Sequence, residues 1–261
     1  MASIWLASGQ NIPKMHAEAN KNMESHNPYA SPYSVAQAPE AIRTEFYQKT
    51  YLHLAGAVGA FIVIEAMLFA IPGIDDFALK MIGSGMSWLV VLGLFMGASW
   101  LATKWATSDT SRGMQYAGLV LYVVAEAIIF LPILLMAVRY SGQPQLVGQA
   151  GIITLGLFTG LTFLAFTTKK DFSFLGGMLK VAGFVALGLI VASLLIGFNL
   201  GIWFSGAMVL IAGGSILHQT SSIIHHYRPD QHVAASLGLF ASVALLFWYV
   251  LRILMAFSSS D

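Results

Sequence analysis

The chain has 261 residues, of which 57% are hydrophobic and only 10% are charged. A soluble domain carries roughly 25% charged residues, so this composition excludes an ordinary water-soluble globule. The net charge of +1 argues against a nucleic-acid partner, and the absence of cysteine excludes disulfides, thiolate metal sites and cysteine nucleophiles.

The first 45 residues differ from the rest because they are polar and carry charges of both signs. They contain neither the apolar run of a signal peptide nor the acid-free, Arg-rich pattern of a transit peptide. We expect a cytoplasmic polar arm over residues 1–45 and a membrane domain over residues 46–261. A solvated extension is the ordinary interpretation of such an arm, and docking against a partner is the alternative.

Seven apolar stretches are each long enough to cross the hydrocarbon core, which takes about 20 residues of helix. The predicted spans are Tyr51–Pro72, Leu79–Thr103, Tyr116–Arg139, Leu146–Thr167, Gly176–Asn199, Trp203–Ile224 and Val233–Phe257. Backbone polar groups in lipid must be satisfied within the chain, which favours helices. The sequence therefore predicts an all-α integral membrane protein, a seven-transmembrane-helix bundle, with the lipid bilayer as its first partner.

Lys and Arg are distributed unequally over the two sides of these spans. The residues on the N-terminal side are Lys14, Lys21, Arg43, Lys49, Lys104, Arg112, Lys169, Lys170, Lys180 and Arg228. The opposite side has Lys80 and Arg139, and Arg252 lies inside the last span. Because positive residues are retained in the cytoplasm, the N-terminus is expected there and the C-terminus outside.

Three pairs of glycines stand four residues apart in or directly beside predicted spans, at Gly93 and Gly97, Gly156 and Gly160, and Gly197 and Gly201. Such pairs let helices approach closely. We expect them to pack helices within one bundle, and a dimer interface is the alternative.

Two carboxyl groups fall within spans, where ionisable side chains are costly and therefore informative. Glu126 lies near the midpoint of the third span, and Glu65 lies about one turn past the midpoint of the first. Each could respond to protons or cations, or could hold a proton and join helices through hydrogen bonds. Both interpretations stay open for Glu126, whereas the second is favoured for Glu65. Pro132, further along the third span, is expected to kink it.

Four histidines cluster around the end of the sixth span: His218, His225, His226 and His232. Imidazoles near one membrane face could sense pH or bind a transition metal. No carboxylate stands at helical spacing with them, so a solvated group of loop histidines is the favoured interpretation and no metal site is predicted.

Catalytic and cofactor patterns are absent from the sequence. The last span lacks the lysine that a retinal protein needs, and Gly213-Gly214-Ser215-Ile216 lacks the second glycine of an intramembrane serine protease motif. We therefore expect no catalytic residues, no cofactor and no enzyme activity.

Several segments resemble the bacterial branch of the Bax inhibitor family, also called the transmembrane Bax inhibitor motif family. The segment from Thr167 to Leu179 resembles the loop between that family's fourth and fifth helices, and the segment from Ser215 to His225 resembles its sixth helix. Glu126 with Pro132-Ile133-Leu134 matches its third-helix pattern, and Lys49-Thr50-Tyr51 its entry to the first helix. The resemblance covers roughly residues 43–261 and implies a seven-helix bundle in a bacterial inner membrane, with a periplasmic C-terminus.

The resemblance also implies a pH-sensitive calcium leak, which the family owes to two acidic residues that share a proton. By position these acids fall at Gln219 and near Gly238, neither of which can titrate. Without two carboxylates that raise each other's pKa, this proton switch is not expected here.

Two functions remain as hypotheses. The favoured one is a non-enzymatic regulator or accessory subunit of a membrane assembly, because some bacterial members associate with the membrane-anchored AAA protease; another membrane complex is the other candidate partner. The alternative is a pH-responsive calcium or cation leak channel that relies on Glu126 and His218.

Overall fold

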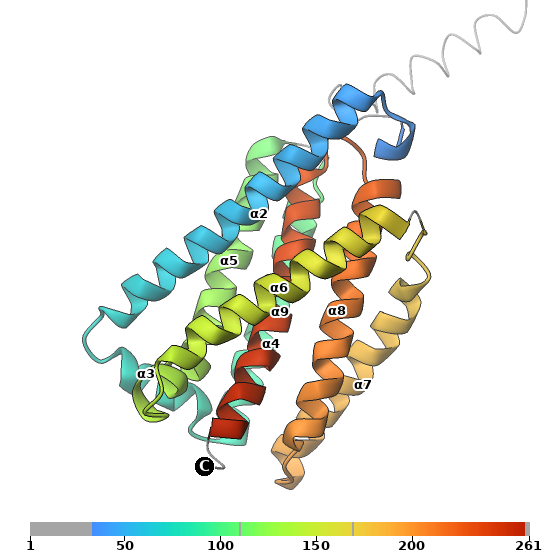
Figure 1. Ribbon diagram of the computed structural model, residues 1–261. Helices are drawn as coiled ribbons and strands as arrows, with labels where there is room; N and C mark the ends of the chain where they lie inside the picture. The colour runs from blue at the N-terminus through green and yellow to red at the C-terminus, as the bar shows by residue number, and fades with distance from the viewer. Residues whose placement is uncertain (1–32, 110, 169, 259–261) are drawn as a thin grey trace, which may run out of the picture.

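The computed structural model describes residues 33–109, 111–168 and 170–258, so the first 32 residues of the predicted arm lie outside them. Its elements are η1 (Val35–Gln37), α2 (Glu40–Phe69), α3 (Ile74–Ile82), α4 (Gly85–Ala106), α5 (Arg112–Leu135), η2 (Met136–Tyr140), α6 (Gln145–Thr168), α7 (Leu175–Ile196), α8 (Gly201–His225) and α9 (His232–Ser258). Over the described residues, seven helices are long and apolar enough to cross a membrane. The predicted seven-helix membrane bundle is thus confirmed (Figure 1).

The part of the predicted arm that the structure describes packs against the bundle. Val35 in η1 is fully buried, and its N–H donates a hydrogen bond to the carbonyl of Tyr227 at 2.8 Å. Helix α2 begins at Glu40, well before the predicted start at Tyr51, and buries Phe46 in the same core. Residues 33–45 are therefore part of the folded unit.

The second predicted span begins at the wrong residue. Leu79 belongs to α3, a short helix that the sequence analysis did not separate from the span. Helix α4 starts only at Gly85, because Ser84 caps it: its hydroxyl accepts a hydrogen bond from the Ser87 N–H at 3.0 Å. Asp75, in the first turn of α3, binds Arg139 at the far end of the α5–η2 unit, which fixes α3 across that end of the bundle.

Helix α5 continues through Pro132 and widens into a single π-helical turn at Met136–Tyr140. Pro132 cannot donate a backbone hydrogen bond, and an irregular turn close by accommodates the loss. A short connection joins α7 to α8 as predicted, with Gly197 and Gly201 both at positive φ.

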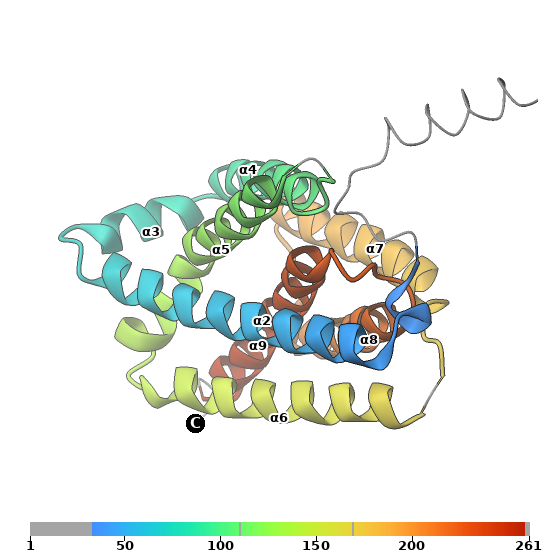
Figure 2. The ribbon, with the colours of Figure 1, turned by 90° about the horizontal axis from the view of Figure 1, so that it is seen from above.

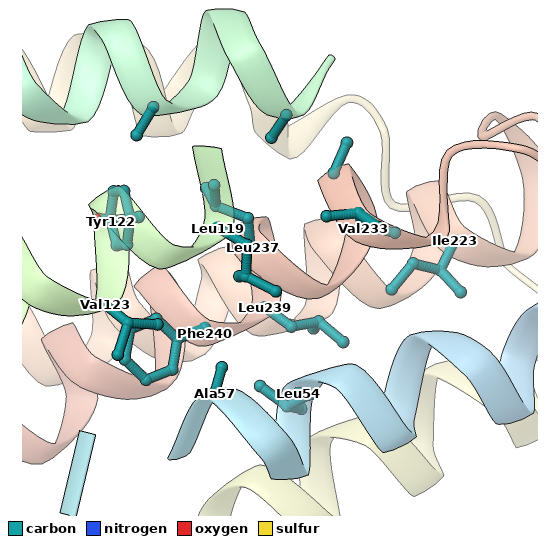
Figure 3. Packing of buried hydrophobic residues seen from close by; sticks show 14 of the residues in the cluster. Leu54, Ala57, Leu119, Tyr122, Val123, Ile223, Val233, Leu237, Leu239 and Phe240 are labelled. Carbon is teal, nitrogen blue, oxygen red and sulfur yellow. The ribbon is translucent and has the colours of Figure 1, made fainter. Parts of the chain in front are cut away.

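Helix α9 runs through the middle of the bundle and contacts α2, α5, α6 and α8 (Figures 1 and 2). Its buried side chains meet those of the neighbouring helices in a continuous apolar cluster. Figure 3 shows Leu237 and Phe240 of α9 among Leu54 and Ala57 of α2 and Val123 of α5. The last span is therefore the structural core, with other helices around it.

The prediction that three glycine pairs bring helices of the bundle together is wrong. No atom outside the local backbone lies within 4 Å of a Cβ built on Gly93, Gly97, Gly156, Gly160, Gly197 or Gly201. Close approach occurs instead at Gly118 of α5, where a Cβ would lie 2.5 Å from the carbonyl oxygen of Ala102 on α4. The spacing of glycines shows where a helix has a face of small residues, but it does not show whether another helix packs on that face.

The start of α2 and the loops α4–α5, α6–α7 and α8–α9 share one end of the bundle. The backbone bond between Val35 and Tyr227 and the ion pair between Arg228 and Asp109 join them. Arg43, Lys49, Lys104, Arg112, Lys170, Lys180 and Arg228 belong to helix ends or loops on this side. Lys14, Lys21 and Lys169 lie outside the described residues.

Candidate functional site

Helices α4, α5, α7, α8 and α9 line a cavity of about 1260 Å³. Tyr122 and Glu126 line it from α5, His218 and Gln219 from α8, and Gly238 from α9. Four of the sequence-predicted site residues, Glu126, His218, Gln219 and Gly238, thus share one space inside the bundle. Its remaining lining is largely apolar, with Lys180 toward one end and Arg252 toward the other.

Glu126 is the only acidic residue among the described residues that line this cavity. Its side chain is 5% exposed, and the hydroxyl of Tyr122, one helical turn earlier, is close enough to interact with its carboxyl group. The ring of Tyr122 is in turn held by Phe240, with ring centroids 6.1 Å apart. Glu126 therefore has a neutral partner on its own helix, and no second carboxylate faces it in the part of the chain that the structure describes.

The two positions at which the resemblance places an acid pair face each other between α8 and α9. A Cβ built on Gly238 would lie 2.8 Å from the side-chain oxygen of Gln219. The Gln219 amide thus covers the backbone of Gly238. The hydroxyl of Tyr227 donates a hydrogen bond to the side-chain oxygen of Gln219 at 3.4 Å. Acidic side chains at these two positions would be close to each other. The positions carry instead the amide of Gln219 and the hydrogen atom of Gly238.

Glu65 lies apart from this site. It is 7% exposed on α2, it does not line the cavity, and neither carboxyl oxygen has a hydrogen-bond partner among the described residues. The expected hydrogen bonds between helices are therefore not found at Glu65. Glu65 and Glu126 do not form a pair.

The four histidines separate into different environments. His218 lines the cavity against Gly176 of α7, His225 contacts the carbonyl of Ser221 one turn earlier, and His232 packs on His53 with ring centroids 5.0 Å apart. Over residues 33–109, 111–168 and 170–258, no group of three His, Cys, Asp or Glu side chains could hold a metal ion.

A carboxylate that was not predicted from the sequence lies beside His226. Asp171, in the α6–α7 loop, lies 3.1 Å from the Nε2 of His226. Burial alone would raise the pKa of Asp171, but hydrogen bonds from the Ser173 N–H and the Ser221 hydroxyl, with His226 nearby, lower this pKa to about 2. The Asp171-Phe172-Ser173 turn is a local signal that could have revealed an anchored carboxylate. Its other partners, Ser221 in α8 and His226 directly after α8, are far away in the sequence and could not be found from residue spacing.

The segments that carry the resemblance are therefore in contact. The Phe172 N–H donates to the Ser221 hydroxyl at 2.8 Å, so the loop before α7 is bound to α8. His218, one turn before Ser221, faces the carbonyl of Phe172 at 3.4 Å. This clasp holds α7 against α8 at one end of the cavity.

Comparisons with known proteins agree with this arrangement. A family model described as "Inhibitor of apoptosis-promoting Bax1" matches residues 43–259. Bax inhibitor 1 of Schizosaccharomyces pombe is 27% identical over 258 residues, which is 95% of this chain and 91% of that protein. The Modulator of FtsH protease YccA of Escherichia coli is 30% identical over 176 residues, or 66% of this chain and 76% of that protein.

An uncharacterized protein of Neisseria meningitidis serogroup A is 28% identical over 181 residues, 68% of this chain and 78% of its own length. The family match covers the whole membrane bundle, including the cavity and the α6–α7 loop that is bound to α8. The chain belongs to the Bax inhibitor family of multi-pass membrane proteins.

Proposed function

We propose that this protein works by contact, as a non-enzymatic regulator or accessory subunit of a membrane protein assembly. The observation that carries the proposal is the Gln219 side chain lying over Gly238 in a cavity with Glu126 as its one acid among the described residues. Two carboxylates held together shift each other's pKa and can act as a proton switch, whereas an amide does not titrate. A proton-operated pore of that kind therefore lacks its sensor.

The proposed partner is inferred from the exposed apolar surface of the bundle and from one relative. The E. coli relative is called a modulator of a protease, FtsH, which supports a membrane-anchored AAA protease as the partner here. Another membrane complex is the second candidate. Many large apolar side chains on α2, α4, α6 and α7 are exposed, as an intramembrane partner or lipid requires.

The proposed location is a bacterial inner membrane, with the N-terminus in the cytoplasm and the C-terminus in the periplasm. Seven basic residues of the described chain lie at the end of the bundle where α2 begins, which supports this orientation. The proposed domain division remains an N-terminal arm and one membrane bundle, and the packing of Val35 supports a bundle that includes residues from 33 onward.

Affinity purification in a mild detergent tests the proposal. The full chain should recover a membrane protein complex, identified by mass spectrometry. A chain without residues 1–32 should be compared with it, since this truncation keeps Val35 and its bond to Tyr227. Reduced recovery would assign docking to the arm, and undiminished recovery would assign it to the bundle. Purification of the full chain without any stoichiometric membrane partner would contradict the proposal.

A calcium or cation leak through the bundle is the second candidate, and one observation favours it. Glu126 lines a large cavity that reaches from Lys180 to Arg252. Liposomes loaded with a calcium dye separate the candidates. A leak that depends on pH in the natural chain and falls in Glu126→Gln would support the channel, whereas equal calcium entry at all pH values supports a contact function.

A further inference from the structure

The walls of the cavity that α4 and α7 form are two apolar stripes. On α7 the lining residues recur every three or four positions, through Leu179, Gly183, Ala186 and Ile190. Helix α4 contributes Leu92 and residues at similar spacing along its full length. Each helix thus turns one face to the cavity from end to end.

The two helices touch at one end. A Cβ built on Gly85 at the start of α4 would lie 2.7 Å from the carbonyl oxygen of Leu194 near the end of α7. Toward the other end the cavity separates them: Trp100 of α4 lines it although 65% of its side chain is exposed, and Gly183 of α7 lines it and is also exposed. Figure 2 shows both helices on the side of α9 away from α6. The cavity is therefore a slit that opens sideways to lipid.

The open end of the slit is basic. Lys180 lines it and is exposed, and no ion pair joins it to another described residue. On the opposite wall Lys104 lies 5.2 Å from the ring centre of Trp100. Thr103 and Thr107 line the same region, and their hydroxyls donate to backbone carbonyls of α4, which leaves the lysines as the groups that would meet an anion. This end suits an anion with oxygen acceptors.

The length of the slit suits a hydrocarbon chain. From Lys180 to Ser193 the lined face of α7 extends about 20 Å at the rise of an α-helix. One leaflet of the hydrocarbon core is about 15 Å thick. An extended peptide segment would leave its backbone groups unsatisfied against such apolar walls, whereas an acyl chain has no such groups. Glu126 is one carboxyl group in this largely apolar lining, and the Tyr122 hydroxyl is its polar neighbour.

We propose that this slit binds an anionic phospholipid of the leaflet at the Lys180 end, with one acyl chain between α4 and α7 and the phosphate beside Lys180. The lipid would act as a filler that completes the loosely packed side of the bundle. The proposal is independent of the contact function above, since either a regulator or a channel could hold such a lipid.

Native mass spectrometry of the full chain tests it, after reconstitution into bilayers of equal phosphatidylglycerol and phosphatidylcholine. The natural chain should retain phosphatidylglycerol. Gly183→Phe should lower this retention about tenfold, because excluding even two methylene groups from the slit has that effect. The matched control is Gly188→Phe, on the same helix: both glycines are exposed with open space at Cβ, but Gly188 does not line the cavity. It should retain lipid as the natural chain does.

A second variant tests whether the charge of Lys180 sets the headgroup preference, and it leaves the apolar walls of the slit unchanged. Lys180→Gln should lower the preference for phosphatidylglycerol over phosphatidylcholine about fivefold, by loss of one charge-assisted contact. Lys80→Gln, at the opposite end on α3, should leave it unchanged. Equal lipid retention by Gly183→Phe and the natural chain, or an unchanged headgroup preference in Lys180→Gln, would overturn the proposal.

Discussion

Helix α9 buries side chains from His232 to Leu251, whereas α7, on the other side of the cavity, buries only Ala186 among its 22 residues. The α9 side is an apolar core shared with α2 and α5, and the α7 side borders the cavity that holds Glu126 and Gln219. The difference indicates a division of roles: α2, α5 and α9, with one end of α4, form the packed core, while α7 mainly bounds the cavity.

The largest effect is expected where the core side has no room at all. In Gly118→Val the new side chain would meet the backbone of α4 at Ala102 and Ala106. Overpacking against backbone costs about 3 kcal/mol or more, and the protein should lose its folded population in detergent. Gly113→Val, in the same helix with open space at Cβ, is the control for valine's own helix propensity. Similar thermal midpoints for the two variants would contradict the close α4–α5 contact.

The two buried acids should respond in opposite directions. Glu65→Leu removes a carboxyl group without a described partner, so we expect an increase in unfolding free energy of about 1 kcal/mol. Glu126→Leu removes the polar neighbour of the Tyr122 hydroxyl and should lower the unfolding free energy by about 1 kcal/mol. Thermal unfolding followed by circular dichroism measures both. Destabilisation by Glu65→Leu as large as that by Glu126→Leu would show that Glu65 has a partner.

A smaller effect is expected at the clasp between the α6–α7 loop and α8. Because folding lowers the pKa of Asp171 to about 2, this carboxylate stabilises the fold above its unfolded pKa of about 4. The contribution is lost as pH falls through that window. The stabilisation by Asp171 should be roughly 0.5 kcal/mol, because Asp171 and His226 are about half exposed and solvent screens their charges.

Asp171→Asn measures this contribution. Hydrogen exchange of the Phe172 and Ser173 amides should be faster in the variant at neutral pH, and the difference from the natural chain should vanish near pH 2. A difference that persists unchanged in acid would mean that the charge of Asp171 is not involved. Asp230 pairs with Arg228 in another loop, so Asp230→Asn is the matched control and should leave those two amides unchanged.

The sequence predicted the parts of the fold that depend on the length of apolar runs. Seven spans were found because each is about as long as the bilayer requires, and the family was found from segments such as Thr167–Leu179. Helix α3 was missed because its residues continue the apolar run of the next span, and only the cap at Ser84 separates them. The glycine pairs failed because spacing within one helix carries no information on its neighbours.

The candidate site shows the same limit. The sequence could predict that Gln219 and Gly238 replace an acid pair, since this depends on residue identity alone. It could not predict that Glu65 stands apart from Glu126 or that Asp171 meets His226, because those outcomes depend on which helix faces are in contact. The contrast between the core side and the cavity side therefore appears only in three dimensions.

The most direct measurement of the central claim is calcium entry into liposomes at about pH 6 and about pH 8, where a carboxylate pair with a raised pKa would change its protonation. The natural chain is compared with the double variant Gln219→Asp/Gly238→Asp, in which the far end of the Gln219 side chain no longer occupies the space that a Cβ at 238 needs. The natural chain should admit calcium equally at the two pH values, and the double variant should show a pH-dependent leak. Entry through the natural chain that changes with pH as strongly as in the double variant would contradict it.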